Sequence, residues 1–331
     1  YSKDKNNVYF INYKESEQKI SDIDVENAED AGNDNYNIDI EIKKLESANS
    51  GSFKIDSIYG KDKNNLYFLN KKITGVNPKT FEIVGSNKLI IKDDKGVYYL
   101  GREEAKKIQN ADINTFEEVS KEYYRDKNNV FYYDNYDGDV KRVKGADAKT
   151  FEVIDAYAGF ARDKNYLYYS NERIKNSDPY TFQRINEHLV RDKNQFYSND
   201  GTVLNVDGKT FQIVKDYEKD YFMYAKDKNK VYYINFMDGK DEMVKELKGL
   251  NPKNFKVLNP YYTKDDKKVY FSKEYADIQE LQNVDVKSFE ALHFENIENK
   301  DDFGKDKNKV YLFGLELKDV KPEKFQVVKE P

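Results

Sequence analysis

The sequence has no cysteine, no tryptophan and only two histidines among its 331 residues. Without cysteine the chain can form no disulfide, thiol nucleophile, iron–sulfur cluster or cysteine-based zinc site. His188 and His293 lie far apart, with no metal-ligand spacing around either of them. We therefore expect no histidine metal site and no Ser–His–Asp triad.

Excess positive charge and long apolar runs are also missing. The 61 acidic residues outnumber the 56 basic ones, and the lysines are spread evenly along the chain. Affinity for nucleic acids comes largely from cationic side chains that neutralise phosphates, so no nucleic-acid partner is expected. No apolar run reaches the roughly 18 residues of a membrane-spanning helix. Tyr1 already lies inside a repeat, and we expect the chain to be a trimmed or mature segment.

Aromatic residues are abundant, with 29 tyrosines and 20 phenylalanines. They recur in an anchor motif that consists of a basic residue, an aspartate, three residues, an apolar residue and an aromatic one. This anchor occurs nine times. From Asp62 to Asp306 seven steps cover 244 residues, a mean period of about 35. The anchor aspartates are Asp4, Asp62, Asp93, Asp126, Asp163, Asp192, Asp227, Asp265 and Asp306.

A second motif, the cap element, follows each anchor. It contains Asn or Asp, two variable residues, a Thr-like residue and Phe, as in Asn77–Phe81 and Asp147–Phe151. The phenylalanine is present in all nine copies, but Lys321 replaces the first residue of the last one. Two coupled motifs in a fixed order indicate a tandem repeat, which should be sought before any other fold signal.

The anchor predicts a tight turn followed by a strand. Asp126 can cap its own backbone, and Gly96 in the third copy indicates a positive φ at the last turn position. Val130–Tyr132 is β-branched and aromatic, which predicts a strand and a hairpin whose first arm ends at Arg125. Both faces of this strand are apolar, so both must be covered.

The cap element predicts a single helical turn that leads into a strand beginning at its phenylalanine. Each repeat then holds four strands: the Phe strand, the arm before Asp, the aromatic strand and a lysine-rich return arm. One such unit cannot bury two apolar faces alone, whereas stacked neighbours can. We predict an all-β fold in which residues 1–331 form a single array of about nine β-meanders. An open, twisted, solenoid-like stack is favoured, and a closed propeller is the alternative.

The first repeat carries an acidic insert at residues 14–50. Its early part is rich in Asp and Glu, and its later part alternates, as in Ile38–Ile42. We interpret it as an acidic loop followed by an extra strand. Loops often carry function, but a drifted half-repeat would explain the insert equally well.

The anchors resemble those of the DKNYY repeat family, most closely from Arg162 (R-D-K-N-Y-L-Y-Y) and from Lys226 (K-D-K-N-K-V-Y-Y). Asp94-Lys95 and Asp266-Lys267 depart from the pattern. The resemblance covers the chain outside residues 14–50. It implies a bacterial protein in the cell envelope or extracellular space, with an export or anchoring segment outside the present chain. It supplies no catalytic residues.

Each candidate site has a structural alternative. The repeated aspartates could form a calcium ladder, but turn capping or Asp–Lys pairing is favoured because calcium needs several converging oxygens. Asp134–Asp139 is interpreted as a hairpin turn. The surplus tyrosines favour core packing over an exposed ligand surface. The adjacent carboxylates are a weak signal for a glycosidase, because neighbouring strand residues point apart. The surplus tyrosines are Tyr123, Tyr124, Tyr217, Tyr221, Tyr224, Tyr261 and Tyr262, and the carboxylate pairs are Asp93-Asp94, Asp265-Asp266 and Asp301-Asp302.

From these patterns we predict a non-enzymatic, exported or cell-surface scaffold. It would bind a protein or a glycan through the 14–50 insert or through exposed tyrosines, without a metal or cofactor. A structural spacer with no specific ligand is the alternative, and a glycan-active enzyme is disfavoured because the repeats are near copies.

Overall fold

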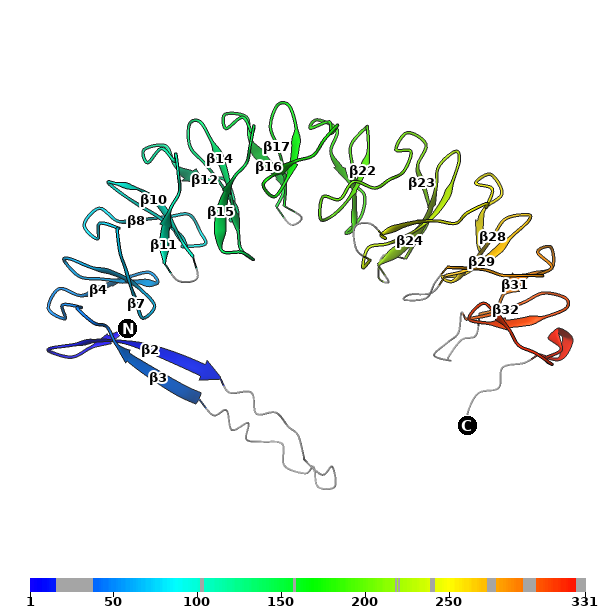
Figure 1. The fold of residues 1–331 in the computed structure, drawn as a ribbon, viewed down its shortest axis with the longest axis horizontal. Helices are drawn as coiled ribbons and strands as arrows, with labels where there is room; N and C mark the ends of the chain where they lie inside the picture. Colours follow the sequence, from blue (N-terminus) through cyan, green and yellow to red (C-terminus); the bar gives the residue numbers. More distant parts are fainter. Residues whose placement is uncertain are drawn as a thin grey trace, which may run out of the picture. The chain divides into compact units, whose positions relative to one another are not determined.

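The computed structural model describes residues 1–15, 38–101, 104–156, 159–217, 219, 221–238, 242–272, 278–293 and 302–325 (Figure 1). Within these ranges the chain forms nine small antiparallel sheets, each built around one anchor, so the predicted all-β repeat fold is confirmed. The described helical structure includes one short 3-10 helix, η2 (Pro322–Lys324). No described helix is long and apolar enough to cross a membrane.

The sheets are numbered here by their anchors. The first has three strands: β1 (Ser2–Lys3), β2 (Val8–Glu15) and β3 (Ile38–Lys44). The second comprises β4 (Lys54–Asp56), β5 (Tyr59–Lys61), β6 (Leu66–Phe68) and β7 (Lys71–Ile73). The third comprises β8 (Glu82–Val84), β9 (Ile90–Asp93), β10 (Gly96–Leu100) and β11 (Ala105–Lys107). The fourth comprises β12 (Glu117–Glu118), β13 (Tyr123–Arg125), β14 (Val130–Asp134) and β15 (Asp139–Arg142).

The fifth sheet comprises β16 (Glu152–Asp155), β17 (Phe160–Arg162), β18 (Leu167–Tyr169) and β19 (Glu172–Arg173). The sixth comprises β20 (Gln183–Arg184), β21 (Leu189–Arg191) and β22 (Phe196–Ser198). The seventh comprises β23 (Gln212–Tyr217), β24 (Phe222–Lys226), β25 (Val231–Asn235) and β26 (Val244–Glu246). The eighth comprises β27 (Lys256–Val257), β28 (Tyr262–Lys264), β29 (Val269–Phe271) and β30 (Gln279–Glu280), and the ninth β31 (Glu290–Ala291), β32 (Phe303–Lys305), β33 (Val310–Leu312) and β34 (Leu315–Glu316).

Each four-stranded sheet is a meander in the predicted order: Phe strand, arm before Asp, aromatic strand and return arm. In the fourth sheet Arg125 pairs with Val130 across the anchor turn, as predicted for this hairpin. The expected positive φ at Gly96 is wrong, because Gly96 is absent from the left-handed residues and its N–H donates to the Asp93 carboxylate at 3.0 Å. The anchor turn therefore forms without a left-handed residue at its last position.

The chain divides into two compact units, one of residues 1–156, 161–164 and 170–173, and the other of residues 157–160, 165–169 and 174–331. Within each unit the apolar clusters lie between consecutive sheets. Val97 and Phe131, for example, join the third sheet to the fourth, and Tyr233 and Tyr270 join the seventh to the eighth. Every residue of β10 and of β25 is buried. The aromatic strands are thus covered on both faces by neighbouring repeats, as stacking requires.

The strand predicted within the insert is present as β3. It pairs with β2 over seven residue pairs and serves as the return arm of the first sheet. β2 has eight residues, whereas the aromatic strands of the other sheets have three to five. The insert therefore lengthens one hairpin of the meander. Residues 16–37, which include most of the predicted acidic loop, lie outside the described residues.

The meander gives every four-stranded sheet two distinct ends. The anchor turn joins the second strand to the third, and the cap element leads into the first strand at this same end, which we name the anchor end. The other two connections, first to second strand and third to fourth strand, lie at the opposite end, which we name the tip end. This alternation follows from antiparallel order and fixes which residues of one sheet can act together.

Candidate functional site

The anchor end is held by one carboxylate oxygen of each anchor aspartate. Its Oδ1 accepts the backbone N–H groups two and three residues later, at 2.7 and 2.7 Å for Asp126. The same pair of bonds is present at Asp4, Asp62, Asp93, Asp192, Asp227, Asp265 and Asp306. The predicted turn capping is therefore confirmed.

The second carboxylate oxygen joins one repeat to the next. Asp126 Oδ2 accepts the backbone N–H of Asp112, the first residue of the preceding cap element, at 2.8 Å. All eight anchors from Asp62 onward accept such a bond, at 2.6–3.3 Å. These eight aspartates are at most 5% exposed. Each buried carboxylate is therefore hydrogen-bonded, as buried polar groups generally are.

Pairing with N–H and hydroxyl donors lowers the pKa of two of these carboxylates, Asp62 and Asp227. Burial acts to raise the pKa of Asp62, but the N–H groups of Asn49, Asn64 and Asn65 together outweigh it, and the pKa lies below its ordinary value. In the cap element Asp285–Phe289, Lys307, followed by the Ser288 N–H, lowers the pKa of Asp285 to about 2. The anchor end thus carries permanent negative charges at neutral pH.

Cap and anchor are also matched through their side chains. Where the cap residue is aspartate, the lysine after the anchor aspartate pairs with it, at 2.7 Å for Asp112 and Lys127. The other such pairs are Asp147–Lys164, Asp178–Lys193, Asp207–Lys228 and Asp285–Lys307. Both anchors that carry Asp in place of this Lys, at Asp94 and Asp266, follow an Asn cap.

The third sheet shows which contacts form when Asp replaces Lys after the anchor aspartate. Asn77 donates its side-chain N–H to Asp94 at 2.9 Å, and the Thr80 hydroxyl donates to the same carboxylate at 2.7 Å. An aspartate at both position 77 and position 94 would place two negative charges together. The carboxylate pair Asp93-Asp94 therefore serves two structural contacts, the buried turn and the exposed cap. Asp301 of the pair Asp301-Asp302 lies outside the described residues.

No group of three or more His, Asp or Glu side chains among the described residues is arranged to hold a metal ion. The acidic stretch that begins at Asp134 forms the predicted hairpin turn. The Asp134 carboxylate accepts the N–H groups of Tyr136 and Asp137. Lys141 forms ion pairs with the carboxylates of Asp134 and Asp137, at 3.0 and 2.9 Å. Lys141 thus neutralises part of the acidic charge within the hairpin itself.

The surplus tyrosines divide between core and surface. Tyr123, Tyr124, Tyr224 and Tyr262 are fully buried, in agreement with the favoured core packing. Tyr217 and Tyr261 are half-buried. Tyr221 is exposed and lies at the tip end of the seventh sheet, in contact with His188 at a ring distance of 4.8 Å.

Exposed apolar side chains gather at the tip ends. In the described connections at these ends, large apolar side chains reach solvent at Leu69, Tyr136, Ile185, Tyr221, Met237 and Phe313. In the described connections at the anchor ends, Tyr180 alone does so. Tips of neighbouring sheets also meet: His188 stacks on Phe236 at 5.2 Å, and Phe271 contacts Phe313 at 6.4 Å. In the second unit the tips of these neighbouring sheets therefore form adjoining surface.

Three of these tip residues have unfavourable backbone geometry. Leu69, Tyr221 and Phe313 have φ values of 51°, 60° and 52°. Bulky side chains avoid this left-handed region, where glycine and asparagine are tolerated. Each of the three is also exposed, at 48%, 45% and 37%. Tyr221 and Phe313 each keep one ring contact with a neighbouring tip, yet all three side chains remain partly in solvent on strained backbone, which points to a role besides packing.

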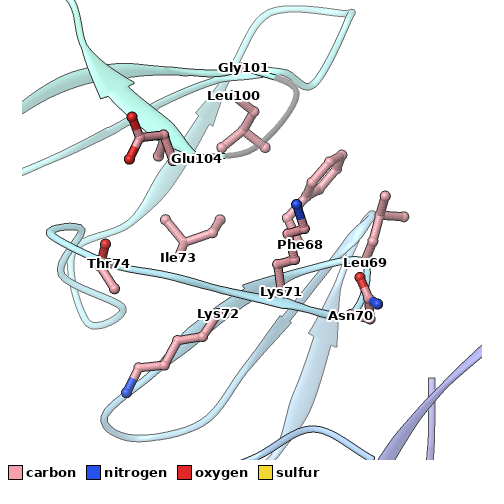
Figure 2. Close-up of a pocket in the computed structure, with 11 residues that line it drawn as sticks. Phe68, Leu69, Asn70, Lys71, Lys72, Ile73, Thr74, Leu100, Gly101 and Glu104 are labelled. Atoms are coloured by element: carbon pink, nitrogen blue, oxygen red, sulfur yellow. The ribbon is translucent and has the colours of Figure 1, made fainter. Parts of the chain in front are cut away.

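A cavity of about 100 Å³ lies between the tips of the second and third sheets. Figure 2 shows Phe68 and Ile73 from one sheet and Leu100 from the other around a common space. Leu69 and Ala105 complete its apolar lining, while Lys71, Lys72 and Glu104 contribute charge. Ligand pockets for drug-sized molecules measure roughly 300–1,000 Å³, so this cavity suits a single side-chain-sized group.

A family model, the DKNYY family, matches residues 1–135, 136–274 and 262–330. The chain belongs to the DKNYY family. No curated protein matches it.

The residues of the DKNYY motif have structural roles, as the sixth sheet illustrates. Asp192 binds the turn, Lys193 pairs with the cap residue Asp178, and the Asn194 N–H donates to Asp192 at 2.6 Å. The Tyr197 hydroxyl is buried and donates to Asp192 Oδ2 at 2.6 Å. The most regular part of the DKNYY sequence therefore builds the fold.

Sequence reasoning missed the tip residues Leu69, Met237 and Phe313. They occupy connections whose length and composition vary from repeat to repeat, so no motif marks them. One signal was available: Leu69-Asn70 and Phe313-Gly314 place a bulky residue in a two-residue hairpin connection, where Asn or Gly is usual.

Proposed function

We propose that this DKNYY protein is a non-enzymatic binding scaffold whose ligand, a protein or a glycan, contacts the tip ends of the sheets. The observation that carries the proposal is the coincidence of exposure and backbone strain at Leu69, Tyr221 and Phe313. In repeat proteins, insertions map to loops on one face, which is often the binding face. Here the 14–50 insert extends the tip connection of the first sheet.

The anchor ends supply the complementary support. Their carboxylates are occupied by backbone N–H groups or paired with lysines, and this leaves them a structural task. The same arrangement recurs from repeat to repeat, whereas an active site would break the repetition at one place. Rigid elements that present variable connections are a common basis for recognition.

We further propose an exported or cell-envelope location, which the family membership supports. The full-length N-terminus and fractionation of bacterial cells test this part. Recovery of the protein in the cytoplasmic fraction alone would contradict it.

The binding proposal is tested with a broad array of host proteins and glycans, probed with the intact chain. We expect at least one ligand whose binding is lost in the tip variants Leu69→Ser, Tyr136→Ser and Met237→Ser. The anchor-end variant Tyr180→Ser is the matched control, because its side chain is also exposed, at 68%. If Tyr180→Ser alone abolishes binding, the tip surface is not the site. If no ligand is found and deletion alters the cell surface, the protein is a structural spacer.

A further inference from the structure

The cavity beside Leu69 suggests the chemistry of one partner, on the basis of the proposed function. We propose that the tips of the second and third sheets bind an extended acidic peptide segment that inserts one aliphatic or aromatic side chain between Leu69 and Leu100. The cavity, its charged rim and the strained leucine each contribute to this assignment.

The cavity fits one apolar side chain. Its volume of about 100 Å³ exceeds what a single water molecule needs and falls below that of a drug-sized site. Phe68 ends β6, Leu69 lies in the β6–β7 connection, and Leu100 comes from the end of β10 (Figure 2). A small hydrophobic pocket open between two hairpins is suited to a protruding residue of an extended chain.

The rim of the cavity determines the charge of the partner. Lys71 and Lys72 are exposed on β7, and neither forms an ion pair within the described residues. By contrast, Lys141 and Lys245 on the return arms of the fourth and seventh sheets each pair with a carboxylate. Glu104 is the described acidic residue of the rim. Lys71 extends beside Phe68, whereas Lys72 points away from the cavity, so Lys71 is the lysine that can attract a carboxylate next to the inserted group (Figure 2).

The backbone conformation and exposure of Leu69 lower the stability of the protein when no partner is bound. Its φ of 51° suits Asn or Gly, yet a leucine is present and remains about half exposed. Ser170 occupies the equivalent position of the fifth sheet with a φ of 52°, and there a polar residue is used. A partner that covers Leu69 would recover the hydrophobic free energy that the free protein forgoes.

The test uses fluorescence anisotropy of a short fluorescein-labelled peptide in which glutamates flank a single leucine. We expect saturable binding to the intact chain, weakened about tenfold or more by Leu69→Asn, since loss of one apolar contact is worth that factor. Leu69→Asn should fold normally, because Asn tolerates the left-handed backbone, and its thermal unfolding midpoint should equal or exceed that of the wild type. Ser170→Asn is the matched backbone control and should bind like the wild type.

Charge is tested separately. The double variant Lys71→Glu with Lys72→Glu should weaken binding about tenfold or more and reverse its salt dependence, because attraction becomes repulsion, whereas Lys106→Glu on β11 should not. Replacement of the glutamates of the peptide by lysines should abolish binding.

Equal binding of the peptide to the wild type and to Leu69→Asn would overturn the inference, as would no detectable binding at all. If the peptide does not bind, but Tyr136→Ser still abolishes binding of a ligand from the broad array, the acidic-peptide inference is wrong and the proposed binding function of the tips stands. A glycan whose binding depends on Leu69 would replace the acidic peptide as the occupant.

Discussion

The anchor and tip ends of the same sheets follow different rules. At the anchor end, carboxylates meet N–H groups and lysines in a pattern repeated along the chain, and buried phenylalanines begin the strands. At the tip end, the connections differ in length and leave apolar side chains in solvent, some on strained backbone. The comparison indicates that the repeated contacts that hold the fold lie mainly at one end, whereas the other end varies from repeat to repeat. Each prediction below tests this division.

The largest expected effect comes from removal of a core ring at the start of a Phe strand. The Phe116 ring is 4% exposed and contacts Phe131 at 5.5 Å. Phe116→Ala should destabilise the protein by about 3–5 kcal/mol in urea denaturation, from lost burial and the cavity left behind. Tyr136→Ala at the tip, 87% exposed, should change stability by less than about 0.5 kcal/mol. Similar losses for both variants would contradict the division between the two ends.

The next effect concerns the bond between repeats. Asp126→Asn preserves shape but replaces one acceptor oxygen by a donor, so the Asp112 N–H loses its partner. The cost should be about 1–3 kcal/mol, measured by thermal or urea unfolding. Asp4→Asn is the matched control, since Asp4 is exposed and, within the described residues, its Oδ2 accepts the Tyr9 hydroxyl and no N–H of a cap element. A loss at Asp4 as large as that at Asp126 would show that the inter-repeat bond is unimportant.

Acidification should loosen the anchor ends first. The pKa values of Asp62 and Asp227 are lowered in the folded protein, because N–H and hydroxyl donors outweigh the effect of burial. Their contribution to stability is therefore complete above the unfolded pKa of about 3.9 and is lost as pH falls through the lower folded pKa. Amide exchange at Asn64 should accelerate below about pH 4.

The exchange control lies at a tip end. The Phe236 N–H bonds to the Tyr221 carbonyl at 2.8 Å, without a carboxylate, and its protection should be retained to lower pH than that of Asn64. Simultaneous loss of protection at both amides at every pH would indicate global unfolding and would remove this distinction.

The smallest effect tests the matching of cap and anchor charges. Lys127→Asp places a second carboxylate beside Asp112, and because the pair is exposed, the melting temperature should fall by at most about 2 °C at low salt. Added Asp112→Asn should restore it, since this reproduces the pairing of Asn77 with Asp94. No recovery in the double variant would refute the matching.

Much of the fold follows from the sequence because two motifs recur in a fixed order. The turn at Asp126, the strand that follows it and the need to cover both of its faces all come from local chemistry. The bond from Asp112 to Asp126 could not be predicted, because it joins two motifs through a backbone group that leaves no trace in composition. The positive φ expected at Gly96 was wrong because the same turn forms at Asn129 and Lys230, which occupy this position in other repeats without a left-handed φ.

The tip surface was largely invisible in the sequence. Exposure of Leu69 depends on how the second and third sheets stack, and a repeat motif carries no information on that point. Tyrosine content pointed to aromatics in general, yet most of the surplus tyrosines are buried. The useful signal was a bulky residue in a short hairpin connection, and it becomes meaningful only beside the observed backbone geometry.

The contact between each cap element and the following anchor has an evolutionary consequence. The donor is a main-chain group, so a junction forms whether the cap residue is Asn49, Asp112 or Asn251. Whole modules can be gained or lost by recombination without redesign of the joints. Lineages could thus change the length of the molecule while each new module brings its own set of loops.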